Sequence, residues 1–465
     1  MTLHACTLAD GSVEAECGSL SVPEDESKPE GRMLSLNLAV IEALAARPKA
    51  DPLVIFAGGP GQAATESGAF IARALSRVRR YRDIVLVDQR GTGKSHALLC
   101  PDDGDVALER RFDRELDVND VRQCLAKLDA DPSRYTTPAA LADLTRVLDA
   151  LGYQRVNLWG GSYGTRVALA FAQQFPERTR RMVLDGAAPT DIELPLFVGR
   201  DAERALGRLY ADCASDPRCH SAFPRGRDSL DQILARLRSG PEQATLTHPR
   251  TGQKVTIPIH YEGFVAGLRS LLYVPQMTAL LPLMMAQAEQ HEWGAFVTAV
   301  LTLSDSMGET PIPLGMFLSV VCSEDVVQIS DADVVNNTRD NFFGRAWLDD
   351  IRRICEFWPK AKLDPHYFEP FTGDTPSLVL SGAEDPVLPP SWGELVAGRL
   401  AHAKHVVVPG MGHGVTSVGC IPERIAEFIE GDQDVSELDF ECAERVHRPP
   451  FFTSAAGPMA LGMTK

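Results

Sequence analysis

Short apolar runs that end in glycine or aspartate recur along the chain, and longer amphipathic stretches separate them. Each run is nearly continuous in Val, Leu and Ile, which is typical of parallel strands that helices bury on both faces. Their alternation with helix-length segments predicts repeated strand–helix units and therefore an α/β fold. The runs cover residues 34–44, 52–59, 83–91, 156–162, 181–189, 377–386 and 405–414.

In two of the intervals between these runs, apolar residues recur with the spacing of a helix. One predicted helix covers residues 139–151 and is opened by Thr137 and Pro138. Another covers residues 165–174 and is closed by Pro176. Proline is tolerated in the first turn of a helix but not in its interior, so both prolines mark boundaries.

Over a longer stretch of the chain the spacing of apolar residues changes from strand-like runs to helical periodicity, which predicts a second unit. Residues 1–189 and 376–465 are expected to form the core. Residues 190–375 show few strand signals and are expected to form a mainly helical cap. Because the insertion follows the strand ending at Asp185, it should lie above the carboxyl ends of the strands, where open α/β sheets bind ligands. The tail after Gly431 is polar and then proline-rich, which predicts a surface strap.

Composition limits the classes of protein that fit. The 465 residues are 44% apolar and 23% charged, which is typical of a globular chain and excludes disorder or collagen. Lys and Arg number 46 against 63 Asp and Glu, a net charge of −17 that argues against a nucleic-acid partner. No apolar run approaches the ~18 residues of a membrane span, so no membrane insertion is predicted. The oligomeric state cannot be predicted from these features.

Ten cysteines form five couples of sequence neighbours, without any CxxC motif. This spacing favours disulfides over zinc ligation and predicts a periplasmic or secreted protein whose signal peptide has been removed and replaced by Met1. The alternative is a cytoplasmic enzyme with ten reduced, buried thiols. The cysteines are Cys6, Cys17, Cys100, Cys124, Cys213, Cys219, Cys322, Cys355, Cys420 and Cys442.

A candidate nucleophile, Ser162, lies in the motif Gly-Gly-Ser-Tyr-Gly (residues 160–164), between an apolar run and a helical pattern. Strand, tight turn and helix in this order are the context of a nucleophile elbow. The flanking glycines allow the strained turn, and the helix that begins there directs its positive end at developing negative charge. The pattern therefore predicts that Ser162 attacks a carbonyl group.

A serine hydroxyl needs a base and a group that orients the base. His413 follows a late apolar run in a glycine-rich turn, and Asp385 follows the preceding run, so serine, acid and histidine occur in the order expected for this fold. Glu384 is the nearest rival of Asp385, and Asp185 is interpreted as structural. We predict a triad of Ser162, Asp385 and His413.

Hydrolysis at a carbonyl also needs donors for the oxyanion of the tetrahedral intermediate. The backbone N–H of Tyr163, directly after the nucleophile, is one candidate. The other is Gly59, in the loop of residues 57–61, where the absence of a side chain lets the backbone approach the substrate. No metal or cofactor is implied by this machinery, whose expected substrate is a peptide or a small acyl compound.

Five motifs together resemble a known family. GGPG from Gly58, DQRGTGKS from Asp88, GGSYGT from Gly160, GAEDPV from Gly382 and GMGHG from Gly410 are similar to those of α/β-hydrolase serine exopeptidases. Within that family the chain resembles proline iminopeptidases and, in its cysteines, the secreted tripeptidyl aminopeptidases. The resemblance implies an α/β-hydrolase fold, with a mostly parallel central sheet, helices on both faces and an inserted, mainly helical cap.

The resemblance also implies several residue roles. Cys322 and Cys355 would form a disulfide in the cap, and Arg90 would be a buried ion-pair partner. Acidic residues of the cap would bind the substrate ammonium group, for which Glu324 and Asp325 are the candidates, although a solvated acidic turn fits them equally well. One departure is that AGGPG stands where many proline iminopeptidases have HGGPG, so Ala57 cannot supply a histidine's hydrogen bonds.

By themselves, the triad residues predict acyl transfer to water. The resemblance adds that the acyl group is an N-terminal residue or a short N-terminal peptide. One alternative is a carboxylesterase or another small-molecule hydrolase, because the same machinery cleaves esters and amides. A second is a catalytically inactive hydrolase that acts as a binding module, against which the complete triad argues.

Overall fold

The computed structural model describes residues 1–8, 11–100, 112, 116–248, 251–306 and 312–458. Within these residues, nine strands form one sheet in the order β1-β2-β3-β5-β4-β6-β7-β10-β11, and β8 and β9 form a separate hairpin. All seven predicted runs contain strands of the large sheet, whereas β1, β2 and the hairpin were not predicted. The strands are β1 (His4–Leu8), β2 (Val13–Pro23), β3 (Met33–Ile41), β4 (Leu53–Phe56), β5 (Ile84–Val87), β6 (Val156–Gly161), β7 (Thr179–Asp185), β8 (Glu242–Thr247), β9 (Lys254–Ile259), β10 (Ser377–Gly382) and β11 (Ala403–Val408).

The helices occupy the intervals between strands. No helix in the described part of the chain is long and apolar enough to cross a membrane. The helices are α1 (Gly68–Ala74), α3 (Val118–Lys127), α4 (Thr137–Leu151), α5 (Tyr163–Gln174), α6 (Leu194–Ser215), α7 (Pro217–Ala222), α8 (Arg227–Ser239), α9 (Tyr261–Leu271), α10 (Pro275–Thr278), α11 (Leu281–Glu289), α12 (Gly294–Ser306), α13 (Leu314–Val320), α14 (Asp331–Asn337), α15 (Ala346–Phe357), α16 (Pro390–Gly398), α17 (Ile421–Glu430) and α18 (Glu441–Glu444).

The sheet is mostly parallel, which confirms the predicted fold class. β5, β4, β6, β7, β10 and β11 pair with one another in parallel. The pairs β1–β2, β2–β3 and β3–β5 are antiparallel and extend the sheet at one edge. The carboxyl ends of the parallel strands therefore meet along a single rim, where α/β sheets hold their ligands.

Helices bury both faces of the sheet. Successive residues of a strand point to opposite faces. In β4, Val54 packs in one apolar cluster with Phe171 of α5. Its neighbour Ile55 packs in another cluster with Phe428 of α17. This double burial explains why the strand sequences are continuously apolar.

Local sequence signals set the bounds of α4. Thr136 caps the helix by accepting a hydrogen bond from the backbone N–H of Ala139, and Pro138 lies in the first turn. Gly152 ends it in the left-handed conformation, at φ 83°. The structure thus confirms the predicted helix over residues 139–151, with its first turn at Thr137.

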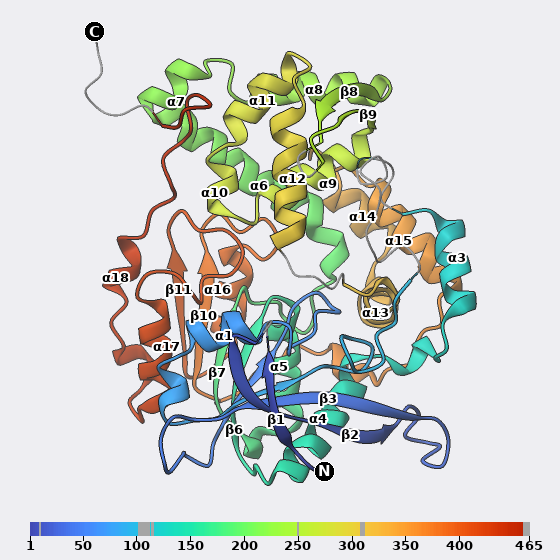
Figure 1. The fold of residues 1–465 in the computed structure, drawn as a ribbon, viewed down its shortest axis with the longest axis vertical. Coiled ribbons are helices and arrows are strands. Elements are labelled where there is room, and N and C mark those ends of the chain that lie inside the picture. The colour runs from blue at the N-terminus through green and yellow to red at the C-terminus, as the bar shows by residue number, and fades with distance from the viewer. Residues whose placement is uncertain (9–10, 101–111, 113–115, 249–250, 307–311, 459–465) are drawn as a thin grey trace.

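The chain between β7 and β10 folds mainly as helices and lies beyond the rim of the sheet, in the upper and right-hand parts of Figure 1. Phe264, Phe296 and Leu206 belong to its largest apolar cluster. The β8–β9 hairpin is the exception to its helical character. The predicted division of the chain at residues 189 and 376 stays a prediction. Contacts cross it, and one of them is the packing of Val121 of α3 with Ile351 of α15.

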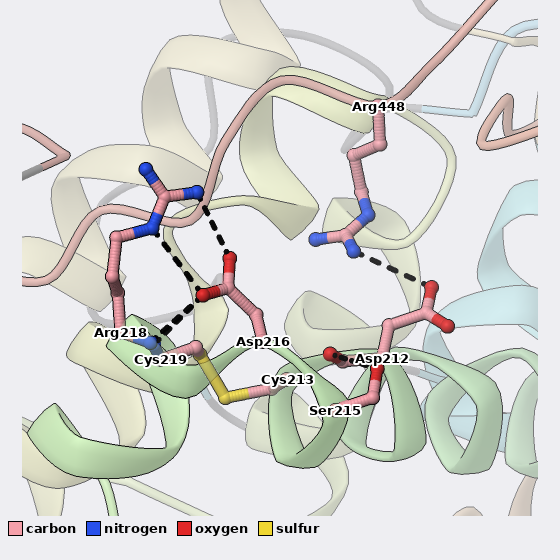
Figure 2. Close-up of a disulfide and its surroundings, with 7 residues drawn as sticks. All are labelled: Asp212, Cys213, Ser215, Asp216, Arg218, Cys219 and Arg448. Carbon is pink, nitrogen blue, oxygen red and sulfur yellow. Dashed lines mark hydrogen bonds and ion pairs between the residues drawn. A yellow bond between two sulfur atoms is a disulfide. The ribbon is translucent and has the colours of Figure 1, made fainter. Parts of the chain in front are cut away.

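Five disulfides join the cysteines in neighbouring couples, including the predicted cap bridge. Figure 2 shows Cys213–Cys219, whose cysteines are the nearest in sequence of the five pairs and which links the end of α6 to α7. Beside it the Asp216 carboxylate caps α7 by accepting hydrogen bonds from the backbone N–H groups of Arg218 and Cys219. The others are Cys6–Cys17, Cys100–Cys124, Cys322–Cys355 and Cys420–Cys442.

The turn after β5 is anchored by a buried ion pair. The Arg90 guanidinium donates two hydrogen bonds to the Asp143 carboxylate of α4, at 2.7 and 2.8 Å. Both side chains are almost fully buried. This agrees with the expected role of Arg90, and its remaining donors reach the backbone carbonyls of Pro23, Glu24 and Arg134.

Candidate active site

Ser162 lies in a strained turn between β6 and α5, with φ 56° and ψ −126°. A side chain on Gly160 would collide with the backbone of Gly164, and one on Gly164 would collide with the carbonyl oxygen of Phe56. The Ser162 N–H donates to the Asp185 carbonyl at 2.9 Å, which fixes the turn to β7. The two glycines thus let the turn pack against β4 while Ser162 stands at the start of α5.

His413 and Asp385 meet above the ends of β11 and β10. The distance from His413 Nδ1 to Asp385 Oδ2 is 2.7 Å. Asp385 is fully buried, and its other oxygen accepts hydrogen bonds from the backbone N–H groups of Val387 and Leu388 at 2.8 and 2.9 Å. An ionised carboxylate only accepts, so it holds the proton on Nδ1 and leaves Nε2 able to take another.

Charge and burial act in opposite directions on these two groups. Burial lowers the pKa of His413, but the Asp385 carboxylate outweighs it and raises the pKa above the ordinary 6.5. Burial alone would raise the pKa of Asp385, yet the positive charge of protonated His413 and the hydrogen bonds hold it below 3.8. The arrangement therefore favours a charged imidazolium beside a carboxylate, which is the state a base reaches after taking a proton.

Asp185 anchors the loop that carries His413. Its buried carboxylate accepts hydrogen bonds from the N–H groups of Val415 and Thr416 and from the Thr416 hydroxyl, at 2.7 to 2.9 Å. The same hydroxyl accepts a bond from the Trp159 indole at 2.9 Å. These bonds fix the chain immediately after His413, a structural role as the sequence indicates for Asp185.

The loop of residues 57–61 lies directly against Ser162. A Cβ added to Gly58 would lie 3.2 Å from the Cβ of Ser162. The Gly58 N–H is already used, because it donates to the Gln62 side chain at 3.1 Å. Gly59 has a positive φ of 109°, which favours glycine. The backbone N–H groups of Gly59 and Tyr163 remain the predicted oxyanion donors.

A cleft of about 330 Å³ opens at Ser162 and His413. Trp159 and Phe70 contribute aromatic walls, and Phe70 is 42% exposed. Phe70 belongs to α1, a seven-residue helix that the sequence pattern did not predict because it is too short to show periodicity. The full lining is Ile55, Ala57, Gly58, Gln62, Ser67, Phe70, Ile71, Trp159, Gly161, Ser162, Asp185, His413, Gly414 and Ser417.

Two family models match the chain. The family described as alpha/beta hydrolase fold matches residues 51–238, which include Ser162. The family described as TAP-like protein matches residues 340–437, which include Asp385 and His413. The chain has the α/β-hydrolase fold, and these two parts of it are similar to the two families. This confirms the resemblance that the sequence motifs indicated.

Curated relatives of this α/β hydrolase carry peptidase names. It is 26% identical over 470 residues to serine protease Hip1 of Mycobacterium tuberculosis, covering 90% of this chain and 85% of that protein. It is 25% identical over 452 residues to tripeptidyl aminopeptidase of Streptomyces coelicolor, covering 89% and 80%. A probable proline iminopeptidase of the same organism is 31% identical over 209 residues, covering 42% of this chain and 50% of that protein.

Glu324 and Asp325 have other partners in this α/β hydrolase than a substrate amine. Both side chains are fully buried in a π-helical turn (Val321–Asp325) and pair with Arg166 of α5. Glu324 accepts hydrogen bonds from Thr137 and Tyr367, and burial raises its pKa above 4.5. Neither residue is among those that line the cleft. An ammonium group would have to displace these internal bonds, so the geometry does not support the expected amine site.

Proposed function

We propose that this α/β hydrolase is a serine aminopeptidase that acts through an acyl-enzyme at Ser162. The observation that carries the proposal is the 2.7 Å bond between His413 and Asp385 beside a strained serine in the same cleft. A neutral imidazole that a carboxylate orients can activate a serine hydroxyl. The alignment with peptidases over about nine-tenths of the chain supports a peptide as substrate.

In the first half of the reaction, Ser162 Oγ attacks the carbonyl carbon and its proton moves to His413 Nε2. The tetrahedral oxyanion accepts hydrogen bonds from the backbone N–H groups of Tyr163 and Gly59. The C–N bond then breaks, and the leaving amine takes the proton from His413. In the second half, water gives a proton to His413 and its oxygen attacks the ester carbonyl. The bond between the acyl carbon and Ser162 Oγ then breaks, His413 returns the proton to Oγ, and the acid leaves.

The acyl group that fits the proposal is the N-terminal residue or a short N-terminal peptide. Its side chain would contact the apolar walls that Trp159, Ile55 and Phe70 form beside Ser162. The five disulfides favour an oxidising compartment, outside the cytoplasm, as the place where such an enzyme works.

The nucleophile can be tested with Ser162→Ala and a matched control. Ser417 lines the same cleft and is exposed, so Ser417→Ala removes a hydroxyl from the same surface. We expect Ser162→Ala to lose labelling by a fluorophosphonate and to lose peptide hydrolysis by about 10⁶-fold. Ser417→Ala should keep both. Labelling of Ser162→Ala at the wild-type rate would refute the assignment.

A further inference from the structure

The loop that carries His413 is confined on three sides, which explains its glycines. A Cβ on Gly382, near Asp385, would collide with the Gly412 carbonyl. A Cβ on Gly412 would collide with the carbonyl oxygen of Tyr273, and one on Gly410 with the backbone nitrogen of Arg448. The three neighbours come from the end of β10, from the segment after α9 and from the C-terminal segment.

Tyr273 makes two direct contacts with His413. Its carbonyl oxygen accepts the backbone N–H of His413 at 3.0 Å. Its ring meets the imidazole edge-on, with ring centroids 5.1 Å apart and an interplanar angle of 74°. One contact fixes the backbone of His413 and the other restricts rotation of its ring, so together they define where Nε2 lies.

Arg269 holds Tyr273 in turn. Its guanidinium donates to the Tyr273 hydroxyl at 2.8 Å and lies 5.4 Å from the centroid of the ring. Both residues belong to α9 or directly follow it, within the chain that separates β7 from β10. The charged groups that act on His413 are therefore Asp385 and Asp185 from the sheet side and Arg269 from α9.

We propose that Tyr273 is a positioning residue that aligns His413 with Ser162, and that Arg269 fixes Tyr273 for this task. The inference rests on the proposed function, since it assigns His413 the role of base. The segment that forms the predicted cap would then hold the imidazole of His413 in place. Displacing α9 would remove both the backbone hydrogen bond and the ring contact between Tyr273 and His413. The positive charge of Arg269 also opposes the rise in the His413 pKa that Asp385 causes.

The rate at which a fluorophosphonate labels Ser162, measured as a function of pH through the titration of His413, tests this role without assuming a substrate. Tyr273→Ala should lower the labelling rate by at least about tenfold, because a correctly positioned base contributes ~10² to 10⁴. Tyr273→Phe keeps the ring but loses the hydroxyl that Arg269 holds, so its rate should lie between those of the wild type and Tyr273→Ala. Arg269→Met should move the acid limb of the profile to higher pH, since it removes a charge that lowers the pKa of His413.

A second arginine–tyrosine pair, between α8 and α9, provides a matched control. Arg238 of α8 donates to the hydroxyl of Tyr261, at the start of α9, at 3.0 Å. Arg238→Met should leave the acid limb unchanged. The pKa of His413, measured by NMR in the folded wild type and Arg269→Met proteins, gives the same comparison independently of Ser162.

Two results would overturn the inference. One is a Tyr273→Ala protein that labels within twofold of wild type. The other is an imidazole pKa that does not rise in Arg269→Met. If Tyr273→Ala fails to fold, Tyr273→Leu, which keeps apolar bulk but no ring, replaces it. Failure of the proposed function is distinguishable, because Ser162→Ala would then keep the labelling and the peptide hydrolysis of the wild type.

Discussion

The imidazole of His413 is under the influence of charges of both signs, and their balance sets the pH range in which it accepts a proton. Burial and Arg269 lower its pKa, whereas Asp385 and Asp185 raise it. The negative charges prevail, so the pKa lies above 6.5. If His413 is the base, as proposed, it must be neutral to act, which ties activity to this titration.

We therefore expect kcat/KM to rise with pH through the His413 pKa and to reach half its plateau above pH 6.5. Protons bind more tightly to a histidine that faces a carboxylate, so protonation abolishes the base at a higher pH than for a free histidine. Asp385→Asn should move the residual acid limb to lower pH. A wild-type limb centred at or below pH 6.5, with the fold intact by circular dichroism, would contradict this account.

The three proposed triad residues could be predicted because each follows an apolar run in a motif of small residues. Glu324 and Asp325 show the limit of this reasoning. Their sequence suggests an accessible acidic turn, but both side chains are buried and pair with Arg166, more than 150 positions away. Tyr273 carried no signal at all, since its role depends on where α9 packs.

At the scale of elements, the turn from β6 to α5 is compact because two glycines let backbone atoms approach closely. Gly164 contacts the chain at the end of β4, where a methyl group has no space. Gly207, in α6, is exposed and a Cβ there meets nothing within 4 Å. The two positions are both helical, so they form a natural pair for comparison.

Gly164→Ala should destabilise the fold by about 1 to 3 kcal/mol, because the new methyl group would force β4 and α5 apart. Gly207→Ala should instead stabilise it by ~0.5 to 1 kcal/mol, since alanine restricts the unfolded chain and favours the helix. Denaturant unfolding measures both. Equal effects at the two sites would mean that the close approach at Gly164 does not constrain the turn.

The elements that the sequence did not predict share a physical cause. β2 alternates buried and exposed residues because it lies near the antiparallel edge of the sheet, so its sequence contains no continuous apolar run that would indicate a strand. The β8–β9 hairpin alternates in the same way. The strands that were missed are thus partly exposed ones whose apolar residues do not form a continuous run.

At the scale of the whole molecule, the five disulfides each close a short to moderate loop. Cys322–Cys355 joins residues 33 positions apart, whereas Cys213–Cys219 joins residues 6 apart. All four of these cysteines are buried to a similar degree, with at most 2% of each exposed. The two disulfides therefore differ mainly in the length of the loop that each closes.

Replacing Cys322 and Cys355 with alanine should cost more stability than replacing Cys213 and Cys219. The loop-entropy model gives a difference of about 1.5 kcal/mol, because a longer closed loop restricts the unfolded chain more. Thermal unfolding of the two double variants under oxidising conditions measures it. Equal melting temperatures would mean that the bridges do not act through the unfolded chain.

The most direct test of the central claim is hydrolysis of a matched substrate series by the purified protein. The series contains Pro-, Ala- and Ala-Ala-Pro-aminocoumarin amides, their N-acetylated forms and a short-chain nitrophenyl ester. We predict cleavage of the free-amine amides that depends on Ser162, with the acetylated forms cleaved far more slowly. Ester cleavage without amide cleavage, or equal rates on free and acetylated peptides, would contradict the assignment as an aminopeptidase.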